Sequence, residues 1–185
     1  MQTLSSYAKL LNSSLKTDRL LIEPIYAEHA DSLFELMQNK KIYQWISSTP
    51  PQSIDQLKVG WKKHESRLSP DGNEAWLNWA VRRTSDGAYI GKMDAEVNHE
   101  KVATNIGYIF FPDYWGKGYA SESVLEIKNH FSRNGISKIM ATVTLGNETS
   151  YRVLEKSGFI RTRIIPENDI IRGEKYDDVE YVWQF

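Results

Sequence analysis

The chain is 185 residues long, which suits one domain with a substantial core. Its 23 basic and 24 acidic residues leave a formal net charge of −1, and no block of like charge predicts electrostatic binding to nucleic acid. It contains no cysteine, which excludes disulfides, thiolate metal sites and a cysteine acyl-enzyme. Because no apolar run approaches about 18 residues and the N-terminus has no signal-like pattern, we expect a cytoplasmic protein without a membrane segment.

The beginning of the chain predicts a polar lead, a strand and a helix. Residues 1–16 have scattered apolar positions that suit a short helix, and we treat them as an N-terminal extension. A single domain is then expected over residues 17–185. Residues 19–25 alternate as a strand does, and residues 27–39 carry apolar side chains at helical spacing.

The next segments predict an aromatic loop, a second helix and three antiparallel strands. Residues 42–46 are rich in aromatic side chains and lead into a Pro-Pro turn, after which a helix begins at Ser53. Residues 75–83 and 89–98 are two strands joined by a Thr-Ser-Asp-Gly turn. After a polar turn, residues 106–111 form a third strand that is apolar enough to be buried.

The third strand leads into a glycine loop and the longest predicted helix. Pro112 stops the strand, and Gly116 and Gly118 precede the helix, which Asn134-Gly135 ends. Its apolar residues fall on one stripe, so one face should pack on a sheet. The stripe consists of Ala120, Val124, Ile127 and Phe131.

The remaining segments predict one strand, one capped helix and two final strands. Residues 138–145 alternate, and the helix that follows has Asn147 as its N-cap and Gly158 as its left-handed C-terminal residue. Two strands, residues 161–166 and 175–185, are joined by a polar loop.

The glycine loop has the properties of an anion site. A helix N-terminus presents unpaired N–H groups and the positive end of the helix dipole, which favour phosphate. Gly116 and Gly118 would let an anion approach the backbone, and Lys117 adds a charge at the rim. The spacing matches neither a P-loop nor a dinucleotide fingerprint, which argues against a nucleotide binder of another fold. On spacing alone, a turn without a ligand is an equal alternative.

The segment Tyr-Trp-Gly-Lys-Gly-Tyr-Ala-Ser resembles the acetyl-CoA pyrophosphate loop of the GCN5-related N-acetyltransferase (GNAT) superfamily, in its RimJ/RimL-like, ribosomal-protein-acetyltransferase-like branch. Trp115, Gly118 and Ala120 occupy the marked positions of the pattern Gln/Arg-x-x-Gly-x-Gly/Ala, and Trp115 is a departure typical of that branch. The resemblance extends from about Thr17 to the C-terminus. It implies an α/β protein with a mixed, mostly antiparallel sheet of about seven strands, splayed at the central strand and flanked by about four helices.

The resemblance also implies that acetyl-CoA is the co-substrate and that no metal takes part. The backbone of residues 109–111 would pair with the pantetheine amides, and Asn147 would contact the cofactor while capping its helix. The cofactor-binding residues expected on this basis are Ile109, Phe110, Phe111, Trp115, Gly116, Lys117, Gly118, Tyr119, Ala120, Ser121 and Asn147.

Acetyl transfer to an amine needs a neutral amine, a polarised carbonyl and a proton for the leaving thiolate. The tyrosine that donates this proton in many superfamily members is Leu154 here. Ser150 matches a serine of the branch that faces the thioester sulfur and is the candidate donor, although a first-turn serine also satisfies free N–H groups. Glu96 is the candidate base, and Asp94 on the same strand face is the alternative. Glu122 is expected to serve the helix dipole.

We therefore predict an enzyme that moves an acetyl group from acetyl-CoA directly to a primary amine on a protein N-terminus or a small molecule. The alternative is a non-catalytic acyl-CoA-binding or regulatory module of the same fold, which the missing tyrosine favours. The expected partner is the amine-bearing acceptor, with no nucleic acid or membrane, and the chain is a monomer or homodimer. Tyr43 and Trp45 either pack as a loop or line the acceptor pocket, since this region caps the substrate side in the family.

Overall fold

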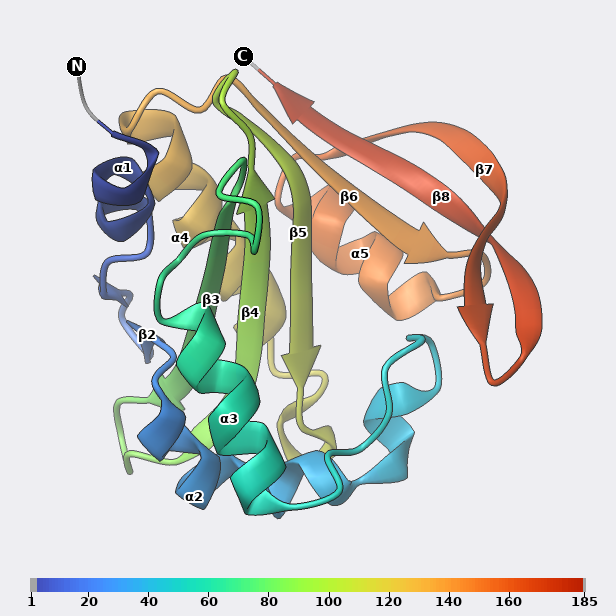
Figure 1. Cartoon of the computed structure of the whole chain (residues 1–185). Helices are drawn as coiled ribbons and strands as arrows, with labels where there is room; N and C mark the ends of the chain where they lie inside the picture. Colours follow the sequence, from blue (N-terminus) through green and yellow to red (C-terminus); the bar gives the residue numbers. More distant parts are fainter. Residues whose placement is uncertain (1–2, 185) are drawn as a thin grey trace.

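A mixed sheet runs through the computed structural model, which describes residues 3–184 (Figure 1). The strands are β1 (Leu15–Lys16), β2 (Leu20–Pro24), β3 (Ala75–Arg83), β4 (Tyr89–Val97), β5 (Val102–Phe110), β6 (Lys138–Thr144), β7 (Ile160–Ile171) and β8 (Glu174–Gln184). The α-helices are α1 (Leu4–Leu11), α2 (Ala30–Leu33), α3 (Ile54–His64), α4 (Tyr119–Arg133) and α5 (Glu148–Lys156). Short 3-10 helices are η1 (Ala27–His29), η2 (Leu36–Gln38), η3 (Lys40–Tyr43) and η4 (Pro112–Tyr114).

The order of the described strands is β1-β2-β3-β4-β5-β6-β8-β7, and every neighbouring pair is antiparallel except β5 and β6. In Figure 1, α3 lies in front of the central strands, whereas α4 and α5 lie behind the sheet. This arrangement confirms the predicted α/β fold with a mostly antiparallel sheet. The strand beyond the expected seven is the two-residue β1, which pairs with β2.

The sheet splays between its two parallel strands. β6 pairs with β5 at only two positions, Val102 with Lys138 and Ala103 with Ile139, and the strands then diverge (Figure 1). β5 stays paired with β4 as far as Phe110, while β6 stays paired with β8 along its whole length. The divergence opens the interior of the sheet beside the end of β5, where the glycine loop begins.

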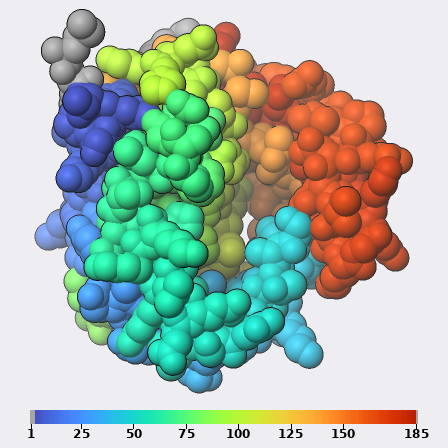
Figure 2. All heavy atoms as spheres, in the orientation of Figure 1, coloured from blue at the N-terminus to red at the C-terminus, as the bar shows by residue number. Residues whose placement is uncertain are grey.

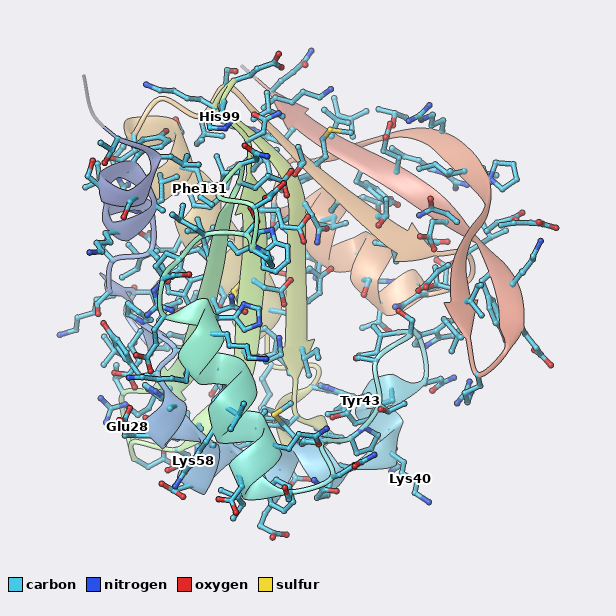
Figure 3. The ribbon with its side chains drawn as sticks, in the orientation of Figure 1. Glu28, Lys40, Tyr43, Lys58, His99 and Phe131 are labelled. Atoms are coloured by element: carbon cyan, nitrogen blue, oxygen red, sulfur yellow. The ribbon has the colours of Figure 1, made fainter. Side chains whose placement is uncertain are left out.

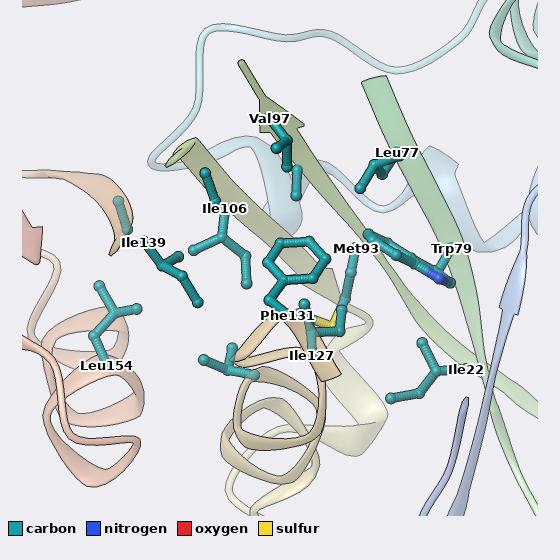
Figure 4. Packing of buried hydrophobic residues seen from close by; sticks show 14 of the residues in the cluster. Ile22, Leu77, Trp79, Met93, Val97, Ile106, Ile127, Phe131, Ile139 and Leu154 are labelled. Carbon is teal, nitrogen blue, oxygen red and sulfur yellow. The ribbon is translucent and has the colours of Figure 1, made fainter. Parts of the chain in front are cut away.

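The main core lies between the sheet and α4. The stripe predicted for this helix is confirmed, because Val124, Ile127 and Phe131 are fully buried. Figure 4 shows Ile127 and Phe131 packed against Met93 and Trp79 from the central strands. The rings of Trp79 and Phe131 have centroids 6.2 Å apart. This packing holds α4 against the sheet and so sets the position of its N-terminus.

The N-terminal segment contributes to the same core. Tyr7, Ala8 and Leu11 of α1 are buried in it, and the Tyr7 hydroxyl donates to the Asn134 carbonyl at 2.8 Å. The proposed division between an extension and a domain at residues 16 and 17 stays a prediction. Residues 1, 2 and 185 of the predicted ranges lie outside the described residues.

The continuous helix expected over residues 27–39 is wrong. The chain there forms three short pieces, η1, α2 and η2, and Asn39 is extended with φ −69° and ψ 108°. Several of the hydrogen bonds span three residues, as from the Met37 N–H to the Phe34 carbonyl at 3.1 Å. Helical spacing of apolar residues is a weaker constraint than packing. Here Leu33 and Met37 pack into a second core cluster with Trp61 of α3.

The polar loop expected between residues 166 and 175 is mostly strand. β7 continues to Ile171, and a two-residue turn at Arg172 and Gly173 leads directly into β8. Both turn residues have positive φ, 53° and 86°, which matches the twist of a hairpin. The register between β7 and β8 shifts between Ile165 and Asp169. Residues 166–168 of the expected loop therefore form a bulge, whose extra residues need no ladder partner, and Asp169 is again paired, with Tyr176.

Candidate active site

Two cavities open where β5 and β6 separate. The large cavity has a volume of about 470 Å³ and the small cavity about 150 Å³. Figure 2 shows the molecule hollowed here, between the segment that follows η3, the central strands and the β7–β8 hairpin. The wall that both cavities share consists of Trp45, Ile46, Tyr108, Asn147 and Ser150. Molecules bound in the two cavities would therefore meet beside these side chains.

The glycine loop forms one end of the large cavity. Gly116 and Gly118 have φ of 72° and 81°, in the left-handed region that glycine adopts without strain. Gly118 is the N-cap of α4, so the N–H groups of the first helical turn have no helical acceptor. Tyr119, Ala120 and Ser121 of that turn line the cavity. This is the geometry of an anion site at a helix N-terminus.

Arg19, just before β2, ties the glycine loop to the sheet. Its guanidinium donates to the Lys117 carbonyl at 3.1 Å and lies 4.6 Å from the Tyr119 ring centroid. It also pairs with Glu122 at 2.5 Å, and the Thr17 hydroxyl donates to the same carboxylate at 2.5 Å. Sequence analysis placed Glu122 in the first turn of α4 but missed Arg19. A residue 98 positions before the loop leaves no local signal.

Basic side chains line the large cavity opposite the loop. Arg152 and Lys156 come from α5, and Lys41 comes from η3. No acidic side chain lines this cavity among the described residues. The positive lining suits a polyanionic ligand such as a nucleotide-linked thioester. The spacing of Arg152 and Lys156, one helical turn apart, was a signal in the sequence that our prediction did not use.

The shared wall contains the predicted proton donor. The Asn147 side chain accepts from the Ser150 N–H at 3.3 Å, which confirms Asn147 as the N-cap of α5. The Ser150 hydroxyl has no hydrogen-bond partner among the described residues, whereas its carbonyl accepts from the Tyr108 hydroxyl at 3.2 Å. Burial raises the pKa of Tyr108. Leu154, at the position of the usual tyrosine, is fully buried. The donor role of Ser150 stays a prediction.

All the predicted cofactor-binding residues line the large cavity except two. The Phe111 side chain is buried in the second core cluster, and its N–H donates to the Ile90 carbonyl at 2.9 Å. The Lys117 ammonium donates to a loop carbonyl at 2.8 Å. Trp115 donates from its indole to the Phe110 carbonyl at 2.5 Å, so this backbone acceptor already has a partner. Cofactor binding by the strand backbone stays a prediction.

The two candidate bases lie on the face of β4 turned away from the main core and line neither cavity. Burial raises the pKa of Glu96, and the nearby Glu74 and Asp94 carboxylates add to the rise. The Asp94 carboxylate lies over Gly107, where a Cβ would be 2.4 Å from Asp94 Oδ2. Since Gly107 lines the small cavity, Asp94 is next to that cavity. Glu96 as the base stays a prediction.

In the aromatic segment, residues 42–46, one of the two candidate residues lines the cavities and the other packs in the interior. Trp45 lines both cavities, and the Thr144 hydroxyl donates to its carbonyl at 3.0 Å. Tyr43, labelled in Figure 3, is buried, and its hydroxyl donates to the Met37 carbonyl at 2.8 Å. Burial raises the pKa of Tyr43 to about 12. Trp45 is therefore a wall of the cavities and Tyr43 a packed loop residue.

This fold, with an anion site at the splay, is that of the GNAT acetyltransferases, and the chain belongs to that family: the model of the acetyltransferase (GNAT) domain matches residues 19–160. The chain is 27% identical over 169 residues to the uncharacterised N-acetyltransferase YoaA of Bacillus subtilis, covering 90% of this chain and 94% of that protein. It is 24% identical to the uncharacterised N-acetyltransferase p20 of Bacillus licheniformis, covering 89% and 92%.

Solved structures show the same fold. The RimL ribosomal L7/L12 alpha-N-protein acetyltransferase in complex with coenzyme A matches with a TM-score of 0.81 at 17% identity, covering 94% of this chain and 98% of that one. The spermidine N-acetyltransferase of Vibrio cholerae in complex with CoA and spermine has a TM-score of 0.75 at 21% identity, covering 91% and 96%. These likenesses show the shared fold, and the family model over residues 19–160 confirms the predicted GNAT superfamily.

The chain is thus an acetyl-CoA-dependent acetyltransferase by its family, as predicted. No helix within residues 3–184 is long and apolar enough to cross a membrane. In the same range no group of three or more His, Cys, Asp or Glu side chains could hold a metal ion.

Proposed function

We propose that the chain transfers an acetyl group from acetyl-CoA directly to a primary amine, without an acyl-enzyme intermediate. The observation that carries this proposal is that the two cavities meet at Ser150. The large cavity has the anion site and the cationic lining that the phosphates of acetyl-CoA need. The small cavity adjoins it where a thioester could be attacked from the other side. Direct transfer needs both substrates bound at once, and this arrangement allows it.

The proposed reaction exchanges one bond for another. The lone pair of the neutral amine forms an N–C bond to the thioester carbonyl carbon, and the C–S bond then breaks. The amine nitrogen loses one proton to a base, and the thiolate leaving group takes one proton from a donor. We propose Glu96 as the base, directly or through water, with Asp94 as the alternative, and Ser150 as the donor.

The comparisons support an amine acceptor. RimL is named as acetylating a ribosomal protein and the Vibrio cholerae enzyme as acetylating spermidine. For this chain we propose a protein N-terminus or a small-molecule amine as the acceptor class.

Calorimetric titration with acetyl-CoA, followed on the same sample by thiol release with mixed amines, tests the proposal. ATP and NAD serve as controls for general phosphate binding. We expect acetyl-CoA to bind at least about tenfold more tightly than either control, because they lack the thioester arm that the strand and the α5 wall would contact. Acetyl-CoA binding without thiol release across a broad amine panel would contradict transfer to an amine.

A further inference from the structure

The two cavities carry opposite charge. Lys41, Arg152 and Lys156 line the large cavity, which has no acidic lining residue among the described part of the chain. Asp169 and Asp178 line the small cavity, which has no Lys, Arg or His among its described lining residues. The large cavity would attract an anionic ligand and repel a cationic one, and the small cavity would do the reverse. The charge of a ligand would therefore decide which cavity it enters.

Asp178 carries an unsatisfied hydrogen-bond acceptor in the small cavity. Its side chain is buried, with 4% of the residue surface exposed. Oδ2 accepts from the Asn168 amide at 2.7 Å, but Oδ1 has no partner among the described residues. Its neighbour across the strand pair, Thr144, directs its hydroxyl proton to the Trp45 carbonyl at 3.0 Å. A buried carboxylate oxygen without a hydrogen-bond donor destabilises the folded protein. The unpaired Oδ1 therefore indicates that a bound ligand supplies the donor.

The surroundings of Asp178 favour a cation as that donor. Burial raises the pKa of its carboxyl and nearby Asp169 and Asp177 reinforce the rise, whereas a hydrogen bond from Asn168 and the nearby Thr144 hydroxyl oppose it. None of the ion pairs in the described residues includes Asp169 or Asp178. Two carboxylates share the cavity with no basic side chain, and an ammonium group would neutralise their repulsion.

Apolar side chains form part of the lining of the small cavity, beside its polar residues. These side chains are Ile106, Val143 and Leu154, together with Ile46 of the shared wall. An aliphatic stem fits such walls, since its methylene groups lose nothing by leaving water. The cavity therefore suits an alkylammonium chain whose charged end faces the β7–β8 hairpin and whose other end faces Ser150.

We propose that the acceptor is an aliphatic diamine or longer polyamine, and that Asp178 binds its non-reacting ammonium group, with Asp169 beside it. This inference rests on the proposed amine acetylation. The nitrogen that attacks a thioester must be neutral, whereas the nitrogen held by the carboxylates of Asp178 and Asp169 stays protonated. One nitrogen cannot do both, so the acceptor carries two. Asp178 is a specificity-determining residue, not a base.

The test compares putrescine with n-butylamine, which differ by one terminal amino group. We expect putrescine to have a kcat/KM for thiol release at least about tenfold higher than that of n-butylamine in the wild-type enzyme, because a charge-assisted hydrogen bond to a buried group contributes that much. Asp178→Asn keeps the shape and removes the charge, and it should bring the two amines to within about twofold. The affinity for acetyl-CoA, measured by calorimetry, should not change.

Asp177→Asn is the matched control, because Asp177 is the preceding residue of β8 and lines neither cavity. It should keep the preference for putrescine. Calorimetric titration of putrescine into the enzyme–CoA complex gives a second readout that needs no turnover. Wild type should bind and Asp178→Asn should bind at least about tenfold more weakly. If Asp178→Asn does not fold, Asp169→Asn, at a half-buried position, should weaken the same binding severalfold.

Failure of this inference and failure of the proposed function look different. An enzyme that binds acetyl-CoA and releases thiol equally with both amines, or whose preference survives Asp178→Asn, retains the proposed function and overturns the diamine assignment. A peptide N-terminus used in strong preference to putrescine would also overturn it. A chain that neither binds acetyl-CoA nor releases thiol with any amine would instead refute the proposed function.

Discussion

The two cavities differ in how their parts are joined along the chain. The large cavity is built around one stretch, residues 109–121, with further walls from α5 and residues 41–46. The small cavity is built from β5, β6, β7 and β8 and the segment after η3, and its charged residues are Asp169 and Asp178. A site within one stretch has a recognisable motif. A site between distant strands exists only once the sheet has splayed.

The two cavities are expected to bind different substrates. If acetyl-CoA binds in the large cavity and the amine in the small one, substitutions in the glycine loop should alter acetyl-CoA affinity and leave the KM for the amine unchanged. Substitutions at the small cavity should do the reverse.

Gly118→Glu should have the largest effect. Gly118 has φ 81°, and a Cβ there would lie 3.5 Å from the Arg19 guanidinium, so a glutamate is strained and places negative charge in the anion site. We expect acetyl-CoA affinity to fall by more than about 100-fold, since several charge-assisted hydrogen bonds are lost. Calorimetry measures this directly. The matched control is Gly72→Glu, at φ 74° in open space away from both cavities, and equal losses in the two variants would point to backbone strain alone.

Glu96→Gln tests the base and should lower kcat by about 100-fold, the lower end of what a general base contributes. The pKa of Glu96 is raised above its usual 4.5, chiefly by burial. A base must be deprotonated, so wild-type kcat/KM should fall as the pH drops through this raised pKa, and the variant should lose that acid limb. Asp94→Asn is the comparison variant. If Asp94→Asn removes the fall of kcat/KM at low pH and Glu96→Gln does not, Asp94 is the base.

Ser150→Ala should lower kcat by about tenfold or more, because the thiolate would then take its proton from water. Acetyl-CoA affinity should stay within about twofold, since the Asn147 cap uses the Ser150 backbone N–H and not its hydroxyl. Single-turnover thiol release measures the chemical step. Thr149→Ala, one residue earlier in α5 and also lining the large cavity, is the control. An unaltered rate would remove Ser150 from the mechanism.

Arg19→Met should have the smallest of these effects, about tenfold weaker acetyl-CoA binding. It removes the hydrogen bond to the Lys117 carbonyl and the ion pair with Glu122, which together hold the loop. A lysine cannot reproduce the forked contacts, so Arg19→Lys should recover only part of the affinity. The ion pair is partly exposed, so thermal stability should change little. Unchanged affinity in both variants would show that the loop keeps its shape without Arg19.

Much of the fold could be predicted from local patterns. The stripe of α4, the cap at Asn147 and the strands of the meander follow from side-chain periodicity and from capping chemistry, which act over a few residues. Predictions failed where tertiary contacts outweighed local preference. Residues 27–39 bend into short turns to fill the second cluster, and the polar segment after residue 165 forms a bulged strand because β8 pairs with it.

The candidate site divides in the same way. The glycine loop was predicted from its place before a helix and from its resemblance to a family motif, and Asn147 from its position as a helix cap and from the same resemblance. Arg19 and Asp178 were not predicted, since one arginine or aspartate among 47 charged residues has no distinguishing pattern. Asp94 was ranked below Glu96, yet only its carboxylate lies against a residue of the small cavity.

The order of the elements and the family could be read from the sequence, because they depend on motifs of residues close together in the chain, and the family resemblance also implied a splayed sheet. The tertiary structure was needed to show that β5 and β6 separate after two residue pairs, and that the resulting cavities carry opposite charge. The reason is physical: strand pairing and side-chain packing bring together β4, β5 and the β7–β8 hairpin, and the charge on a cavity wall is a property of that assembly.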